Sequence, residues 1–182
     1  MKEKIRNEVA ERARNLKSRE DTSSTIASKL STLPEFRSAD KILFYYSLPD
    51  EVDTTGILTR SIGEKTVYLP ITNTETGEIE FGKVGSLDEL QEGAYGIPEP
   101  QNKSKIEASH FQLIIVPGRA FDLKGNRLGR GRGYYDKLLA RTSCPKVALA
   151  FEYQIIEAVP CEPHDIGVDK IITEERIIEC SP

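Results

Sequence analysis

Leu113-Ile114-Ile115-Val116-Pro117-Gly118 joins a short aliphatic run to two residues that interrupt regular structure. So short an apolar run, bounded by turn residues, is typical of a buried strand and cannot cross a bilayer. A loop follows, and residues 134–141 then have the pattern of a helix. Strands that alternate with helices in this way predict a sheet with helices on both faces.

The same alternation of predicted strands and helices continues along the chain on both sides of this stretch. Runs rich in β-branched and aromatic residues predict strands at 41–46, 66–69 (ended by Pro70), 78–83 at an edge, 113–116, 146–151, 170–173 and 176–180. Helical patterns predict helices at 2–19, at 22–33 with Asp21 or Ser23 as cap, from Asp53 to near Gly63, at 134–141 and at 154–159. Because no internal repeat or long linker divides the chain, we expect residues 1–182 to form a single domain.

The composition excludes several classes of protein. Apolar residues make up 38% of the 182 residues and charged residues 30%, which is typical of a globular chain with a real core. The net charge of −4 disfavours a general nucleic-acid-binding surface, because such binding depends on a basic excess. Three scattered cysteines and a charged N-terminal segment without a secretory signal predict a cytoplasmic protein that does not enter a membrane. With only two histidines, we expect any metal to be a hard ion on oxygen ligands, such as magnesium.

The segment that carries chemistry is Arg127-Leu128-Gly129-Arg130-Gly131-Arg132-Gly133-Tyr134-Tyr135-Asp136. Alternate glycines let a backbone approach a ligand closely, and free N–H groups in such a loop can hold oxyanions. Arginines bind phosphate oxygens in a fork. The pattern therefore indicates a polyphosphate site, although a solvated loop or an RNA-binding tract has the same composition. It is not a Walker loop, because no Gly-Lys-Ser/Thr follows.

Polar side chains near the ends of the predicted strands have two interpretations each. Asp136 is either a helix-terminal acid or a magnesium ligand beside phosphates. Glu51 belongs either to an acidic turn and cap or to a site that binds a polar heterocycle, on which Tyr46 could stack. His164-Asp165 could be a proton-transfer pair, but a polar loop is the favoured interpretation.

The run Val116-Pro117-Gly118-x-Ala120-Phe121-Asp122-x-x-Gly125-x-Arg127-Leu128-Gly129-x-Gly131-x-Gly133-Tyr134-Tyr135-Asp136 closely resembles the signature of 5-formyltetrahydrofolate cyclo-ligases, also called methenyltetrahydrofolate synthetases. Further segments resemble motifs of that family in the same order: Lys2-x-x-x-Arg6, Asp50 to Thr54, Gly96 to Pro100, and His164-Asp165-x-x-x-Asp169. Arg132 departs from the pattern, because many members have lysine or glycine there.

This resemblance implies a three-layer α/β/α fold with a mixed, mostly parallel central sheet. It also implies an ATP- and Mg²⁺-dependent reaction that turns 5-formyltetrahydrofolate into 5,10-methenyltetrahydrofolate, ADP and phosphate. By position, ATP would contact Lys2, Arg6, Arg127, Leu128, Gly129, Arg130, Gly131, Arg132, Gly133, Tyr134 and Tyr135. The folate would contact Tyr46, Glu51, Arg130, Gly131, Arg132, Gly133 and Tyr134, and Mg²⁺ would bind Asp136 and Asp169.

The expected chemistry assigns catalytic roles to Arg130, Arg132 and Asp136, which would align the reactants and neutralise phosphate charge. We expect a monomer whose partners are small molecules, a reduced folate and ATP, with no nucleic acid and no membrane. Two other functions stay open at this point. One is a cyclo-ligase-like domain that binds nucleotide or folate without turnover. The other is an RNA-binding module that uses the glycine- and arginine-rich residues 127–133, called the Gly/Arg loop below.

Overall fold

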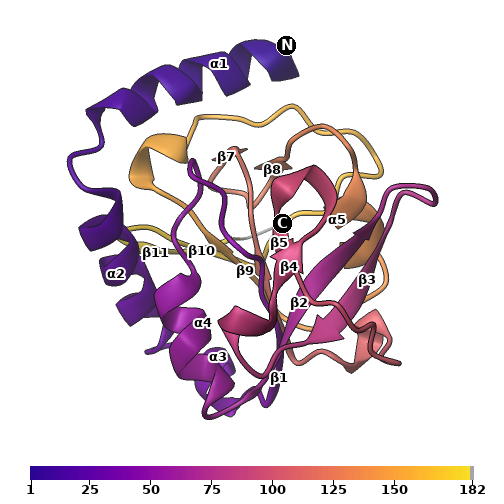
Figure 1. Cartoon of the computed structure of the whole chain (residues 1–182). Coiled ribbons are helices and arrows are strands. Elements are labelled where there is room, and N and C mark those ends of the chain that lie inside the picture. Colours follow the sequence, from indigo (N-terminus) through magenta and orange to yellow (C-terminus); the bar gives the residue numbers. More distant parts are fainter. Residues whose placement is uncertain (181–182) are drawn as a thin grey trace.

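The computed structural model describes residues 1–180, so positions 181 and 182 of the predicted domain lie outside it. Its centre is a seven-stranded sheet in the order β11-β10-β9-β6-β1-β2-β3 (Figure 1). The strands are β1 Lys41–Leu43, β2 Thr66–Asn73, β3 Glu78–Lys83, β6 Leu113–Val116, β9 Lys146–Leu149, β10 Lys170–Ile172 and β11 Ile177–Glu179. The pairings of β3 with β2 and of β11 with β10, at the two edges, are antiparallel, and the pairings between them are parallel. This confirms a mixed, mostly parallel sheet.

Helices cover both faces of this sheet. One face carries α2 (Arg19–Leu30), α3 (Pro34–Ser38) and α4 (Thr55–Ile62), and the other carries α5 (Tyr134–Leu139). Side chains of β6 alternate between them: Leu113 and Ile115 face the first layer, and Ile114 and Val116 face the second. All four are buried, as their continuous apolar run predicts. The three-layer arrangement is therefore confirmed.

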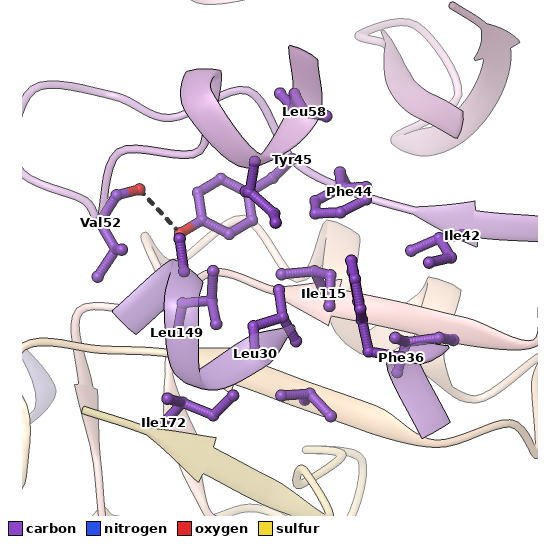
Figure 2. Close-up of a cluster of buried hydrophobic side chains, with 14 of the residues drawn as sticks. Leu30, Phe36, Ile42, Phe44, Tyr45, Val52, Leu58, Ile115, Leu149 and Ile172 are labelled. Atoms are coloured by element: carbon purple, nitrogen blue, oxygen red, sulfur yellow. Dashed lines mark hydrogen bonds between the residues drawn. The ribbon is translucent and has the colours of Figure 1, made fainter. Parts of the chain in front are cut away.

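The larger core lies between the sheet and the α2–α3–α4 layer. Leu30, Phe36 and Leu58 come from the helices and pack against Ile42 and Ile115 of the sheet (Figure 2). The Tyr45 hydroxyl, at the edge of this core, donates a hydrogen bond of 3.1 Å to the carbonyl oxygen of Val52. This bond fixes the chain that leaves β1, and that chain leads to the site.

A small antiparallel pair, β7 (Ala120–Phe121) and β8 (Arg127–Leu128), follows β6. The turn between its strands is closed by the buried Asp122 carboxylate, which accepts hydrogen bonds from the amides of Lys124, Asn126 and Val159. A second small pair joins β4 (Gln91–Glu92) to β5 (Pro98–Glu99). These two pairs frame the carboxyl-terminal edge of the main sheet.

Helix α1 (Lys2–Arg12) lies across the top of the molecule, above β7 and β8 (Figure 1). Val9 is its one buried residue and packs with Ala120, Leu128 and Val159. The predicted helix 2–19 is wrong in its second half: a 3-10 turn follows at Ala13–Asn15, and the backbone of Leu16 is extended. None of the described helices is long and apolar enough to span a membrane.

The predicted caps of the second helix are also wrong. Helix α2 begins at Arg19, and its cap is Ser18, whose hydroxyl accepts a hydrogen bond of 3.2 Å from the amide of Asp21. Serine, aspartate and a second serine within a few residues are all good caps, so residue type alone could not choose among them.

Two further predictions fail for reasons of hydrogen bonding. Strand β2 runs through Pro70, because Pro70 lies beyond the last residue that pairs with β1, Tyr68. Its nitrogen faces away from β3, on the side where the Thr72 amide donates to Glu99 instead. The predicted helix 154–159 is absent from this described segment. The chain has only a 3-10 turn, Glu152–Gln154, after which the Ile156 amide donates to the Phe121 carbonyl.

Candidate active site

A cavity of about 850 Å³ lies at the carboxyl ends of β1 and β6. Its walls come from α1, the chain after β1, the middle of β2, residues 95–99, the Gly/Arg loop with the start of α5, and the loop 162–165. Sheets of this type bind ligands at this edge. The predicted site residues that line it are Lys2, Arg6, Tyr46, Glu51, Arg127, Leu128, Gly129, Arg130, Gly131, Arg132, Gly133, Tyr134, Tyr135 and Asp136.

The Gly/Arg loop takes a course that requires glycine at alternate positions. Gly131 and Gly133 have φ angles of 95° and 69°, in a region that side chains disfavour. A Cβ at Gly129 would come within 2.9 Å of the Arg127 guanidinium. The Nε of Arg6 donates a hydrogen bond of 3.0 Å to the Gly129 carbonyl, so α1 holds the loop from above.

Arg127 and Asp136 form a partly buried ion pair that joins β8 to α5. Their side chains are 4% and 19% exposed, and Nη2 of Arg127 lies 2.7 Å from Oδ1 of Asp136. The same carboxylate oxygen accepts a bond of 3.3 Å from the amide of Ile166. The guanidinium also lies over the ring of Tyr135, 5.7 Å from its centroid. The charged partner, the Ile166 amide and the Tyr135 ring together fix the positions of these two side chains.

Arg130 connects the Gly/Arg loop to the chain after β1. Its guanidinium pairs with Asp50 and lies 3.3 Å from Oε1 of Glu51. Glu51 is nearly buried, and its other oxygen accepts a bond of 2.9 Å from the Leu48 amide. Asp53, not Glu51, serves the start of α4, since it accepts hydrogen bonds from the amide and the hydroxyl of Thr55. Glu51 therefore faces the cavity and not the helix.

Arg132 stacks on an aromatic residue that the sequence analysis missed. Its guanidinium lies 4.5 Å from the ring centroid of Tyr95, and the Tyr95 hydroxyl lies 3.1 Å from that of Tyr134. Tyr95 has a φ angle of 60°, which costs energy in a residue with a side chain. Tyr95 directly precedes the segment Gly96 to Pro100, which resembles a family motif, and this position was the signal in the sequence that could have identified it. Such strain is a feature of functional sites.

The loop 162–165 also reaches the cavity, which the sequence analysis did not expect. Lys2 donates hydrogen bonds of 3.0 Å to Glu162 and to Asp165. The bond with Glu162, followed by that with Asp165, raises the pKa of Lys2. His164 is exposed, and its Nε2 lies 3.7 Å from Asp165, so the two residues do not form a close proton-transfer pair. The His164-Asp165 segment is thus a polar loop whose aspartate holds the first helix.

The two carboxylates that were predicted to bind metal have different surroundings. Asp136 lines the cavity, whereas Asp169 is not among the described cavity-lining residues. Asp169 precedes β10, at the amino-terminal end of a parallel strand, and its carboxylate accepts a bond of 2.7 Å from the Lys146 amide. Across residues 1–180, no group of three or more His, Cys, Asp and Glu residues has the arrangement of a metal site.

Comparisons with known proteins agree with this geometry. The sequence model of the 5-formyltetrahydrofolate cyclo-ligase family matches residues 1–174. The NMR structure of Aquifex aeolicus 5,10-methenyltetrahydrofolate synthetase superposes with a TM-score of 0.85 at 38% identity, covering 98% of this chain and 92% of that one. A 5-formyltetrahydrofolate cyclo-ligase of Mus musculus is 28% identical, with coverage of 94% and 92%. The Mycoplasma pneumoniae 5,10-methenyltetrahydrofolate synthetase shares the fold, with a TM-score of 0.75 at 23% identity.

The match extends beyond the short signature, since it spans nearly the whole chain in both sequence and fold. Residues that resemble the family motifs come from α1, the end of β1, the segment before β5 and the Gly/Arg loop, and they meet in one cavity. This chain therefore belongs to the 5-formyltetrahydrofolate cyclo-ligase family.

Proposed function

We propose that this chain is an enzyme that converts 5-formyltetrahydrofolate and ATP to 5,10-methenyltetrahydrofolate, ADP and phosphate, with Mg²⁺. The observation that carries the proposal is that one cavity brings Lys2, Arg6 and the Gly/Arg loop together with Tyr46 and Glu51. A basic, glycine-rich wall suits a triphosphate. A nearly buried carboxylate beside a tyrosine suits a polar heterocycle. Family membership supplies the reaction, and the cavity is large enough for a sizeable ligand.

The reaction needs an oxygen to become a leaving group. The formyl group on N5 is an amide, so its carbon is a weak electrophile. We propose that the formyl oxygen attacks the γ-phosphorus of ATP, the bond to the β-phosphate oxygen breaks, and ADP departs with the electron pair. N10 then attacks the activated carbon, the carbon–oxygen bond breaks to release phosphate, and N10 loses its proton. The protein must align these groups and offset the phosphate charge.

ATP would be held by Lys2, Arg6 and the residues Arg127 to Tyr135. The phosphates would compete with Glu162 and Asp165 for Lys2, and with Asp50 for Arg130. The folate would contact Tyr46, Glu51 and residues 130–134 on the other side of the same loop. Arg130 and Arg132, the two catalytic arginines of this proposal, are both accessible to a ligand in the cavity.

The residues present fit a magnesium ion that is held mainly by phosphate oxygens. Such ions take one or two protein carboxylates and keep several other oxygen ligands. Asp136 lines the cavity, and both of its hydrogen bonds fall on Oδ1, so Oδ2 is the oxygen that a cation could use. Asp169, the second predicted ligand, is not among the described cavity-lining residues, and its role as a metal ligand stays a prediction. Mg²⁺ bound beside Asp136 would neutralise charge on the phosphates.

The RNA-binding alternative has less support. Arg127 and Arg130 are paired with Asp136, Asp50 and Glu51, which offset their charge, so they add little to a basic outer surface. One chain supplies every wall of the cavity, which is why we propose a monomer that acts on small molecules. The cytoplasmic location and the single domain of residues 1–182 stay predictions.

The experiment that tests the proposal is an optical assay with purified protein, ATP, Mg²⁺ and 5-formyltetrahydrofolate. We expect the near-ultraviolet absorption of the methenyl product to rise with time, in proportion to the amount of enzyme. Omitting ATP, or removing Mg²⁺ with a chelator, should abolish the rise. Binding of ATP or folate without product formation would instead favour the non-catalytic alternative.

A further inference from the structure

Two unsatisfied polar atoms stand out in the wall of the cavity. Within residues 1–180, four buried side-chain polar atoms have no hydrogen-bond partner: Oε1 of Glu35, Oγ of Ser61, Nε of Arg127 and the hydroxyl of Tyr135. The Glu35 oxygen is still ion-paired, 3.0 Å from Lys170. Buried polar atoms are nearly always paired, so an exception requires an explanation. Two of the four belong to neighbouring residues of one cavity.

The ring of Tyr135 is held in place by its neighbours. The Arg127 guanidinium lies over it, and that guanidinium is itself fixed by Asp136. The adjacent Tyr134 is different, because its hydroxyl already has a partner in Tyr95. The Tyr135 hydroxyl is therefore a donor that is positioned but not used within the protein.

Like any tyrosine phenol, that of Tyr135 carries its proton at neutral pH and can donate a hydrogen bond. Glu51 belongs to the proposed folate side of the cavity, and Arg127 to the proposed phosphate side. Tyr135 lines the same cavity as both residues, and Arg127 lies over its ring.

We propose that the Tyr135 hydroxyl is a catalytic hydrogen-bond donor to the γ-phosphoryl group while it passes from ATP to the formyl oxygen. This inference rests on the proposed function and adds a residue to its chemistry. As the phosphorus–oxygen bond to ADP breaks and the new bond to the formyl oxygen forms, negative charge spreads over the phosphoryl oxygens. Tyr135 donates a hydrogen bond to one of them and keeps its proton throughout. No other reactant is needed.

The test is the Tyr135→Phe variant, which removes the hydroxyl and keeps the ring. Loss of one such donor lowers turnover by about a hundredfold or more. We expect kcat to fall by that amount, while calorimetry shows a much smaller loss of affinity for a non-hydrolysable ATP analogue. A contact made mainly in the transition state has this signature. Because an unsatisfied buried hydroxyl costs stability, the thermal midpoint of Tyr135→Phe should equal or exceed that of the wild type.

Tyr68→Phe is the matched control. Tyr68 is a buried tyrosine of β2 that packs against Phe111, 5.3 Å between ring centroids, and it does not line the cavity. We expect this variant to turn over like the wild type. The inference is overturned if Tyr135→Phe keeps near-native kcat, if it loses nucleotide affinity as much as turnover, or if its midpoint falls. An inactive wild-type protein would instead refute the proposed function itself.

Discussion

Two arginines of one loop illustrate how burial divides roles at the scale of single residues. Arg127 is 4% exposed and pairs with Asp136, whereas Arg130 is 45% exposed and pairs with Asp50 and Glu51. We expect Arg127→Ala to lower the free energy of unfolding by roughly 2–3 kcal/mol, because it leaves a partly buried carboxylate without its charged partner. Urea denaturation measures this loss.

For Arg130→Ala we predict a small effect on stability and a large effect on turnover. Its pair with Asp50 is exposed, and Glu51 keeps its hydrogen bond from the Leu48 amide, so the loss of stability should be about 1 kcal/mol or less. Its loss should still slow turnover by about a hundredfold, close to 3 kcal/mol, if it offsets phosphate charge. Arg141→Ala is a matched control, since Arg141 is 46% exposed and pairs with Glu107 away from the cavity. If Arg130→Ala turns over like Arg141→Ala, Arg130 has no catalytic role.

At this scale the sequence predicted residue identities better than contacts. The Gly/Arg motif and its resemblance to a family placed Arg127, Arg130 and Asp136 in one site, and the cavity contains all three. Their partners could not be predicted, because Asp50 and Tyr95 reach the loop only through the order of strands in the sheet. The same limit explains Asp169: a motif gives spacing along the chain but not the end of the strand at which a residue lies.

The turn between β7 and β8 shows how one element fixes the site loop. Gly125 has a φ angle of 85°, and a Cβ there would overlap the carbonyl oxygen of Val168 and the side chain of Cys180. We expect Gly125→Ala to destabilise the protein by roughly 3 kcal/mol, the sum of backbone strain and overpacking. Chemical denaturation measures the loss, and turnover should fall with it, since the turn leads into Arg127.

Gly56→Ala in helix α4 is the control for that substitution. A Cβ at Gly56 would meet no atom within 4 Å. Alanine is a better helix former than glycine, so this variant should gain about 0.5–1 kcal/mol. Equal effects of the two substitutions would contradict the role assigned to the β7–β8 turn.

Elements were predictable where one physical signal dominated. Strands β3 and β6 have the predicted bounds, because alternation along β3 and a continuous apolar run in β6 each match one environment. The end of α1 was missed, since polar helical residues continue past Arg12. The course of β2 through Pro70 depends on which neighbouring strand is present at that point, and local sequence does not contain that information.

The stability of the whole molecule in acid depends on its carboxylates, because the chain has 29 acidic and 25 basic residues. Burial alone would raise the pKa of Asp53, but hydrogen bonds from Thr55 and the charge of Arg19 outweigh it and lower the pKa. Burial alone would also raise the pKa of Asp165, but hydrogen bonds from the Glu162 amide and from Lys2 outweigh burial and lower the pKa. A lowered pKa in the folded state means that the charged form stabilises the fold. This contribution is complete above the ordinary pKa of 3.8 and is lost as the pH falls through the lowered value.

We therefore expect the free energy of unfolding to stay level from pH 7 to about pH 5 and then to fall with acid. Asp53→Asn keeps an oxygen that can accept from the Thr55 amide but removes the charge, so it should be less stable at neutral pH and lose less on acidification. Its curve should approach that of the wild type at the lowest pH. Asp40→Asn, at an exposed position before β1, should follow the wild type throughout. Urea denaturation across this pH range gives all three curves, and parallel curves for Asp53→Asn and the wild type would show that the charge of Asp53 does not stabilise the fold.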